Sequence, residues 1–243
     1  MGKLAGDHVQ VLVDGYELTG DSNNIGISDQ RTMLDVTAFA DAVHKFIPGK
    51  RQVSLDHSGY MNVASAGSHP VLKGMGIDGV VSVLVGDNAD PAEGDIAYSV
   101  SVRQGKYSPQ PAVGAFIPFA AMFANKGELG GWGVALAVPV TFTNTANGGS
   151  VDHGAATSNG GAAFLHILQA AASDTYTIIV EGSTTGSFGG EETTLATFTL
   201  DASVLDSERV AITGTIPRYT RWKATRTGSA GDTVELAVNL VRF

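Results

Sequence analysis

The sequence predicts a mainly β protein, with a larger β-rich domain that carries one short helix and a second, smaller β-sandwich domain after it. Short runs of alternating apolar and polar residues recur along the 243-residue chain, and turn residues separate them. Glycine contributes 31 residues, roughly 13% of the chain against a usual value of about 7%, without the three-residue period of collagen. With 43% hydrophobic and only 16% charged residues, the composition argues against a disordered chain.

The strands of the first half follow from this alternation. Residues 51–57 are the clearest case, because Val53 and Leu55 face one side and the polar residues between them face the other. The Asp-Gly pair at 14–15 is a strong hairpin-turn signal. Pro118 favours an edge or bulged strand around it. The other expected strands cover residues 9–13, 16–18, 24–28, 33–37, 79–85, 98–103 and 116–123.

One short helix is expected over residues 63–75. Ser68 is its expected N-cap, Pro70 falls in its first turn, and Gly74 ends it. Every other periodic segment of the first half indicates a strand, so this helix flanks a β structure.

A change of composition divides the chain near residue 145. Residues 144–150 and 157–161 are small, polar and glycine-rich, as linkers are. We therefore expect one domain over residues 1–145 and a second over residues 146–243.

The second half restarts the β pattern. Strands over residues 163–168 and 176–181 are expected to pair through a turn at 171–174. A helix over 162–172 competes, since Ala and Leu favour it, but the flanking glycines favour a strand. Four further strands with even spacing, typical of a small β-sandwich, are expected at residues 194–200, 208–214, 218–226 and 233–243.

The composition also excludes several classes of function. The chain has no cysteine, which removes disulfides, cysteine-based zinc sites, thiol nucleophiles and iron–sulfur clusters. No run of 18 apolar residues occurs, the start lacks a signal-peptide pattern, and Gly6 stands where a myristoylation signal requires Ser or Thr. We therefore expect a soluble chain, made in a reducing compartment, without membrane contact. A net charge of −9 disfavours tight binding of DNA, but not a channel that surrounds DNA and repels its phosphates.

No set of residues predicts catalysis or metal binding. Three of the six histidines follow an aspartate, but at Asp56-His57 strand neighbours point to opposite faces. No metal-binding histidine spacing and no Gly-x-Ser-x-Gly nucleophile motif occurs. The paired carboxylates Glu191 and Glu192 lie in an expected surface loop. We therefore expect no catalytic residue, no metal, no cofactor and no enzymatic activity.

Residues 218–226 form the one basic and aromatic cluster. Tyr219, Arg221 and Trp222 are candidates for contact with a ligand, such as a nucleic acid or a glycan. On a strand, however, Tyr219 and Arg221 share one face, while Trp222 lies on the other with apolar neighbours. This segregation favours a core tryptophan.

Four segments of the first half, in this order, resemble the tail tube (major tail) proteins of long-tailed bacteriophages. They are the hairpin at residues 13–18, the strand end with the Asp-Val-Thr-x-Phe pattern at 34–41, the Ile-Pro-Gly loop at 45–49, and the alternating strand at 53–60. From about residue 151, the chain is similar to the immunoglobulin-like or carbohydrate-binding-like module that some of these proteins carry.

The resemblance implies a tail-tube-type β-sandwich or barrel fold and a structural function in the virion tail. Such proteins form rings, usually of six subunits, that stack into a tube through which genomic DNA passes without specific binding. The implied partners are further copies of the chain and tape-measure and tail-terminator proteins, with assembly in the host cytoplasm. Three subunits would suffice if the second half were a diverged copy of the first.

The resemblance also implies a contact loop, residues 38–50, that reaches the adjacent ring. Phe39, Phe46, Ile47 and Pro48 are the expected contact residues. The alternative is a loop folded onto its own core. Competing functions are a glycan-binding module that uses Tyr219, Trp222 and Trp132, and a capsid decoration protein.

Overall fold

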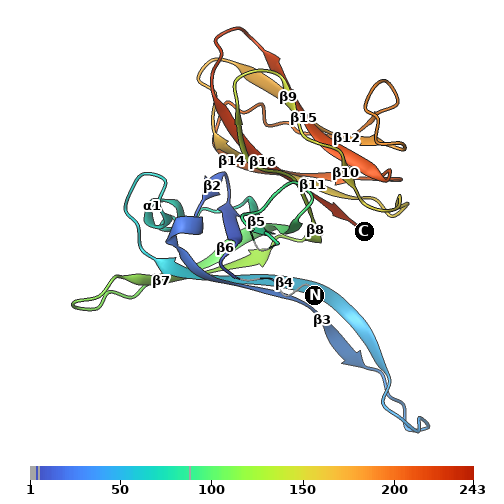
Figure 1. Ribbon diagram of the computed structural model, residues 1–243. Coiled ribbons are helices and arrows are strands. Elements are labelled where there is room, and N and C mark those ends of the chain that lie inside the picture. Colours follow the sequence, from blue (N-terminus) through green and yellow to red (C-terminus); the bar gives the residue numbers. More distant parts are fainter. Residues whose placement is uncertain (1–3, 5, 88) are drawn as a thin grey trace.

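Antiparallel strands make up most of the molecule, which confirms the predicted fold class (Figure 1). The computed structural model describes residues 4, 6–87 and 89–243. The first half contains β1 (Val9–Val13), β2 (Tyr16–Glu17), the 3₁₀ turn η1 (Thr19–Asp21), β3 (Ser22–Asp35), β4 (Phe46–Tyr60), α1 (Ser68–Leu72), β5 (Val80–Val85), β6 (Ile96–Pro109), β7 (Pro118–Asn125) and β8 (Gly131–Phe142). The second half contains β9 (Ala146–Asn147), β10 (Val151–Asp152), β11 (Gly161–Gln169), β12 (Thr175–Ser183), β13 (Thr193–Thr197), β14 (Asp206–Ile212), β15 (Tyr219–Thr227) and β16 (Val234–Arg242).

The larger of two sheets runs through both halves of the chain. Its main path has the order β14-β11-β16-β8-β6-β5-β1-β2, and β7, β4 and β3 continue from β6. Because β8 pairs with both β6 and β16, the sheet is continuous across residue 145. The division into domains at that residue stays a prediction about folding units.

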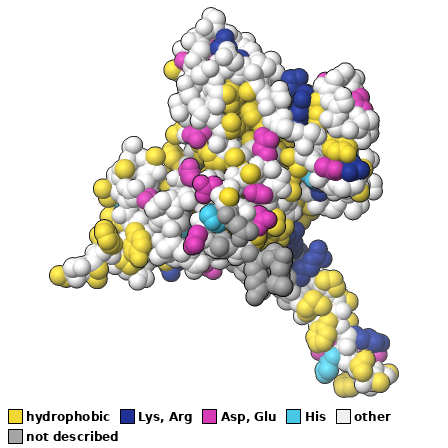
Figure 2. Space-filling view, viewed as in Figure 1, with side chains coloured by type: hydrophobic (Ala, Val, Ile, Leu, Met, Phe, Trp, Pro, Cys, Tyr) yellow, Lys and Arg dark blue, Asp and Glu magenta, His cyan; other side chains and the backbone are white. Residues whose placement is uncertain are grey.

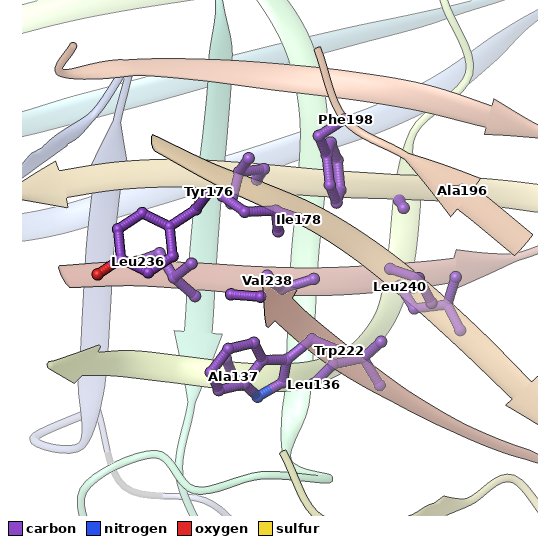
Figure 3. Packing of buried hydrophobic residues seen from close by; sticks show 14 of the residues in the cluster. Leu136, Ala137, Tyr176, Ile178, Ala196, Phe198, Trp222, Leu236, Val238 and Leu240 are labelled. Carbon is purple, nitrogen blue, oxygen red and sulfur yellow. The ribbon is translucent and has the colours of Figure 1, made fainter. Parts of the chain in front are cut away.

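Two large hydrophobic cores lie on the same face of this continuous sheet, because Ile96 of β6 pairs with Val134 of β8 and Val134 pairs with Leu240 of β16. The first includes Leu55, Val100 and Phe123 and lies beneath β3, β4 and β7. The second fills the sandwich between the larger sheet and the sheet formed by β9, β10, β12, β13 and β15. Trp222 and Tyr176 are its largest fully buried side chains, and Figure 3 shows them packed with aliphatic residues of β8 and β16.

A buried polar cluster joins strands of the two halves. The Ser82 hydroxyl lies 2.8 Å from that of Ser99 and 2.9 Å from Nε2 of His166, and Nδ2 of Asn239 donates to Ser99 at 3.1 Å. All four side chains are fully buried. Burial lowers the pKa of His166 to about 3, so the ring is neutral. The cluster connects β5, β6, β11 and β16, and thus fixes how the two halves pack.

The helix begins differently from the prediction. Gly67 occupies the N-cap position and Ser68 is the first helical residue. The Ser68 N–H donates at 2.8 Å to the Asp21 carboxylate, which takes the place of a local cap. Pro70 lies in the first turn as predicted, but the helix spans only Ser68–Leu72 of the predicted 63–75.

Two strand predictions of the sequence are corrected by the pairing. Pro118 is the first residue of β7, which lies between β4 and β6 and is not an edge strand; the bulge lies in β6, at Gly105. Strand β11 was expected to pair with β12, but it pairs with β14 and β16, and residues 170–174 cross to the other sheet. Since β11 is buried on both faces, it takes a central place in its sheet. The preference for a strand over a helix here is confirmed.

Candidate assembly surface

A long hairpin arm projects from the body of the molecule. β4 pairs with β7 only over residues 54–60, so the outer parts of β3 and β4 pair with each other alone. We call residues 29–53 the arm; it extends to the lower right in Figure 1. An isolated two-stranded hairpin is at best marginally stable in water. The rest of the chain therefore packs little against the arm.

The arm exposes apolar side chains on both of its faces, and those on the side turned to the viewer are seen in Figure 2. Leu34 pairs with Ile47 in register, and the next pair, Met33 and Pro48, points to the opposite face. Phe39, at the turn, is fully exposed. Exposed apolar patches of this kind mark sites of interaction with other molecules. We define the arm patch as Met33, Leu34, Val36, Phe39, Val43, Phe46 and Ile47, all at least 47% exposed.

Polar contacts hold the arm in shape at its root and at its turn. At the root, Arg51 Nε donates to Asp29 at 2.6 Å, and the Tyr98 hydroxyl donates to the same carboxylate at 3.1 Å. The hydrogen bond from Arg51 lowers the pKa of Asp29. At the turn, the Thr37 hydroxyl donates to Asp35, and this bond lowers the pKa of that carboxyl. These contacts shape the backbone without covering the arm patch.

The structure places the predicted contact residues on this arm. Phe39 lies in the connecting loop, but Phe46, Ile47 and Pro48 lie on β4, so the segment expected as a loop is strand from Phe46 onward. The alternative of a loop folded onto its own core is wrong, because Phe39 is fully exposed. Contact of these residues with an adjacent ring stays a prediction.

Sequence reasoning missed much of the arm patch. Met33 and Leu34 were expected only as part of an extended segment over residues 33–37. Their signal was two consecutive apolar residues, repeated at Phe46 and Ile47 on the partner strand. Consecutive apolar residues on a strand indicate that both faces are apolar.

The strands β3, β4, β7 and β6 form a four-stranded layer with open edges. β3 pairs with β4 alone among the described strands. At the other side, β6 beyond Gln104 pairs only with β7 within the described part of the chain. Unpaired strand edges are templates for pairing with another chain. This layer therefore has an edge on each side that a second copy can pair with.

The outer face of this layer is polar and nearly free of carboxylates. Its inner face covers the first core, and the C-terminal half lies on the other side of the molecule (Figure 1). The register places one carboxylate, Asp56, among the described residues of the outer face; Met122 of β7 separates it from Lys106, and Arg103 on the same face pairs with Asp78. The other side chains there are Asn24, Ser28, Gln30, Gln52, Ser54, Ser58, Ser108, Ala120, Met122 and Ala124. The excess negative charge of the chain lies elsewhere.

The cluster on β15 does not offer the expected ligand contacts. Trp222 is only 2% exposed and packs against Phe142 in the second core, so its predicted contact with a ligand is wrong. Its position on the core-facing side of the strand is the reason. Tyr219 is half-buried, with the Arg218 guanidinium 4.9 Å from its ring centre. Arg221 lies over Phe188 and pairs with the buried Glu181.

Trp132, the other aromatic candidate, is 55% exposed and packs edge-on against Tyr98. It lines an apolar hollow with Ile96, Val85 and Val134. The hollow has no convergent polar groups of the kind that orient a sugar among these lining residues.

The adjacent titratable residues considered as catalytic candidates make hydrogen bonds within the fold or are exposed to solvent. Burial lowers the pKa of His57 to about 4, and its Nε2 lies 2.7 Å from the Ser22 hydroxyl, while Asp56 is exposed on the opposite face as predicted. Hydrogen bonds, first of all from Ser183, lower the pKa of Glu191 to about 2. Over residues 6–87 and 89–243, no group of three His, Asp or Glu side chains is placed to hold a metal ion. None of the described helices is long and apolar enough to span a membrane.

No protein-family model and no curated protein matches the sequence. Solved structures give partial matches. A chain from the virion of a native gene transfer agent (GTA) particle is 13% identical, with a TM-score of 0.44 over 54% of this chain and 98% of its own. A chain from the tail of an empty GTA particle with C6 symmetry is 14% identical, with a TM-score of 0.43 over 52% of this chain and 96% of its own. A chain of the phage p2 baseplate is 9% identical, with a TM-score of 0.33 over 95% and 97% of the two chains.

Two of these chains come from a GTA virion and a GTA tail, and the third comes from a phage baseplate. With TM-scores below 0.5, these likenesses do not by themselves assign a function to this chain. Any function of the chain therefore has to rest on its own residues, above all on the arm and the four-stranded layer.

Proposed function

We propose that this protein is a structural virion protein that assembles into stacked rings, forming a tail tube through which the genome passes into the host. The observation that carries the proposal is the arm. It is a two-stranded hairpin, apolar on both faces, and no described element of its own chain covers the arm patch. Such a segment is stable and soluble in its working state only when another molecule covers it. In an assembly protein, that molecule is another copy.

The four-stranded layer supports a ring. Pairing of β3 from one copy with the outer end of β6 from the next would remove both open edges. Repeated around an axis, this pairing closes a barrel. The C-terminal half lies away from the outer face of the layer, which puts it on the outside of such a ring (Figure 1).

Six subunits fit this chain better than three. A ring of three would require the second half to be a copy of the first, with its own arm and layer. Among the described strands of the second half the longest have nine residues, and none forms a projecting hairpin like β3 and β4.

The outer face would line the lumen. Most of its side chains are uncharged and offer DNA few contacts. Its charged side chains are Asp56, Lys106 and Arg103, and Arg103 pairs with Asp78. DNA would then slide because the wall does not bind it, rather than because an acidic wall repels it, as the net charge alone suggested. The further partners of this proposal are tape-measure and tail-terminator proteins, with assembly in the host cytoplasm.

Electron microscopy of the purified full chain tests the proposal. Rings or hollow tubes of uniform width are the expected result, at least at high protein concentration. A chain that stays monomeric under all conditions and binds polysaccharide would overturn the proposal in favour of a glycan-binding module. Of the three aromatic residues named for that alternative, Trp222 is buried, Tyr219 is half-buried and Trp132 is 55% exposed.

A further inference from the structure

An apolar hollow lies between the two layers that cover the larger sheet. β3, β4 and β7 cover the first core and the five-stranded sheet covers the second, both on one face of the larger sheet. Between them, Val85 of β5, Ile96 of β6 and Val134 of β8 are consecutive partners across the strands. Together with Trp132 and Leu4 they line a hollow of about 570 Å³. The hollow is thus a strip of the larger sheet that neither layer covers.

The hollow presents large apolar side chains to solvent. Trp132 is 55% exposed and Ile96 is 45% exposed, although Trp132 packs edge-on against the buried Tyr98. Tryptophan contributes strongly where two proteins meet, because one side chain buries a large apolar area. The lining residues are aliphatic, aromatic or glycine. An occupant of the hollow therefore needs an apolar side chain.

The loop that borders the hollow is acidic. Residues 86–95 join Val85 directly to Ile96, and they include no lysine or arginine. The loop contains four carboxylates: Asp87, Asp90, Glu93 and Asp95. The side chain of Asp90 is 93% exposed. Figure 2 shows Asp and Glu side chains gathered near the middle of this side of the molecule.

The same charge extends over the strands beside the hollow. Residues 4–22 and 74–102 form β1, β2, η1, β5 and the first part of β6, and they contain nine carboxylates and no lysine or arginine. The whole chain has 24 carboxylates and 15 lysines and arginines, so these two segments account for its entire net charge of −9. A surface of one charge sign attracts partners of the opposite sign.

Two arginines also lie near the hollow, and both have partners. Arg51, beside Gly131, forms an ion pair with Asp29. Arg242 lines the adjacent pocket with Glu93 and donates at 2.5 Å to the carbonyl of Ala155. The carboxylates of residues 86–95 therefore set the sign of the charge that an occupant meets.

We propose that the hollow binds a basic segment of another protein. One apolar side chain of that segment fills the hollow against Trp132, and the lysines or arginines beside it face the carboxylates of residues 86–95. Exposed charges alone are screened by salt, whereas burial of an apolar side chain is not, so the two contacts together give affinity and orientation. The hollow lies off the arm and off the outer face of the four-stranded layer, so the inference does not depend on the proposed function.

Tryptophan fluorescence offers a direct test, because the chain has two tryptophans and Trp222 is already buried. The probe is a synthetic peptide of four lysine–leucine repeats, added to the full chain at a concentration at which sedimentation velocity shows no assembly. Saturable binding and a blue shift of the emission are expected. In calorimetric titrations, W132A is expected to weaken binding about tenfold, whereas the matched control V204A, at an exposed valine of the C-terminal half, is expected to bind like the wild type. I96S is the second variant, should W132A change the circular dichroism spectrum.

Two further peptides separate the charge from the apolar contact. Lysine–serine repeats and glutamate–leucine repeats are each expected to bind at least about tenfold more weakly than lysine–leucine repeats. Equal binding of either peptide overturns the proposal, and so does equal binding by the wild type, W132A and I96S. A blue shift that appears with rising protein concentration and no peptide would show that a second copy covers the hollow, which also overturns it. None of these results bears on ring formation, which electron microscopy tests separately.

Discussion

The arm and the core of the C-terminal sandwich use the same kind of strand for opposite purposes. On β15, Trp222 is 2% exposed, while on β4 Phe46 is 53% exposed. β15 has strand neighbours in its own sheet and a second sheet against its inner face, whereas the arm has only two strands and no facing layer. An aromatic side chain therefore stabilises the fold only where a second layer of the same chain packs against it. On the arm, a second molecule must supply that layer.

The largest expected effect on stability is that of W222A. Trp222 packs with Phe142 and lies in the core with Tyr176, so its removal leaves a cavity that β-strands cannot collapse around. We expect the free energy of unfolding to fall by about 3–5 kcal/mol, measured by urea unfolding followed by circular dichroism. W222F keeps most of the apolar volume and is expected to cost clearly less. A loss below about 1 kcal/mol for W222A would contradict the claim that the buried Trp222 stabilises the fold.

A second prediction concerns acid. Burial lowers the pKa of His57 from 6.5 to about 4. In the unfolded chain the ring takes up a proton below pH 6.5. Between pH 6.5 and about 4 the unfolded state therefore binds more protons than the folded state, and the free energy of unfolding decreases as the pH is lowered. This residue alone would account for about 3 kcal/mol over that window. His153 and His166, also with lowered pKa values, act in the same direction.

Urea midpoints measured at several pH values test this prediction. H57Q is expected to flatten the decline between pH 6.5 and about 4. Equal slopes for wild type and H57Q would show that His57 is not held neutral by the core.

The difference between these regions also explains what the sequence could predict. Alternation placed β4 and β15 and the inward face of Trp222, because a strand's two faces are a local property. The cap on α1 was not predictable, since Asp21 lies 47 residues from Ser68. Nor was the partner of β11, because pairing between distant strands depends on the whole sheet. The exposure of the arm could not be predicted, since an apolar residue gives no signal of whether its partner is its own chain.

A third, smaller effect contrasts two ion pairs. Glu181 is 3% exposed and accepts hydrogen bonds from Arg221 at 2.9 Å and Lys223 at 3.2 Å. E181Q removes the charge between two cations, and we expect a loss of about 1–3 kcal/mol in urea unfolding. R103Q breaks the Arg103–Asp78 pair, whose side chains are 70% and 50% exposed, and the urea midpoint is expected to stay unchanged, since exposed pairs contribute little. Equal losses in both variants would contradict the distinction.

The smallest expected effect on stability comes from the arm patch itself. Because the fold stays intact, this variant isolates the effect of the arm patch on assembly. In the double variant F46S/I47S, both side chains are about half exposed before the change, so the free energy of unfolding of the monomer should move by no more than about 0.5 kcal/mol. Stacking into tubes should be lost, because the arm no longer offers an apolar surface to the adjacent ring. The matched control V204S/L205S changes an equally exposed pair in the C-terminal half and should assemble normally.

Sedimentation velocity and electron microscopy separate the two readouts for this pair of variants. A stable F46S/I47S that forms no tubes, beside a polymerising V204S/L205S, is the expected result. If F46S/I47S unfolds instead, the arm patch is packed on its own chain in solution and the contrast with Trp222 fails. If both variants polymerise, the arm is not the assembly element, and the open edge of β3 becomes the remaining candidate, because its backbone donors and acceptors do not depend on these side chains.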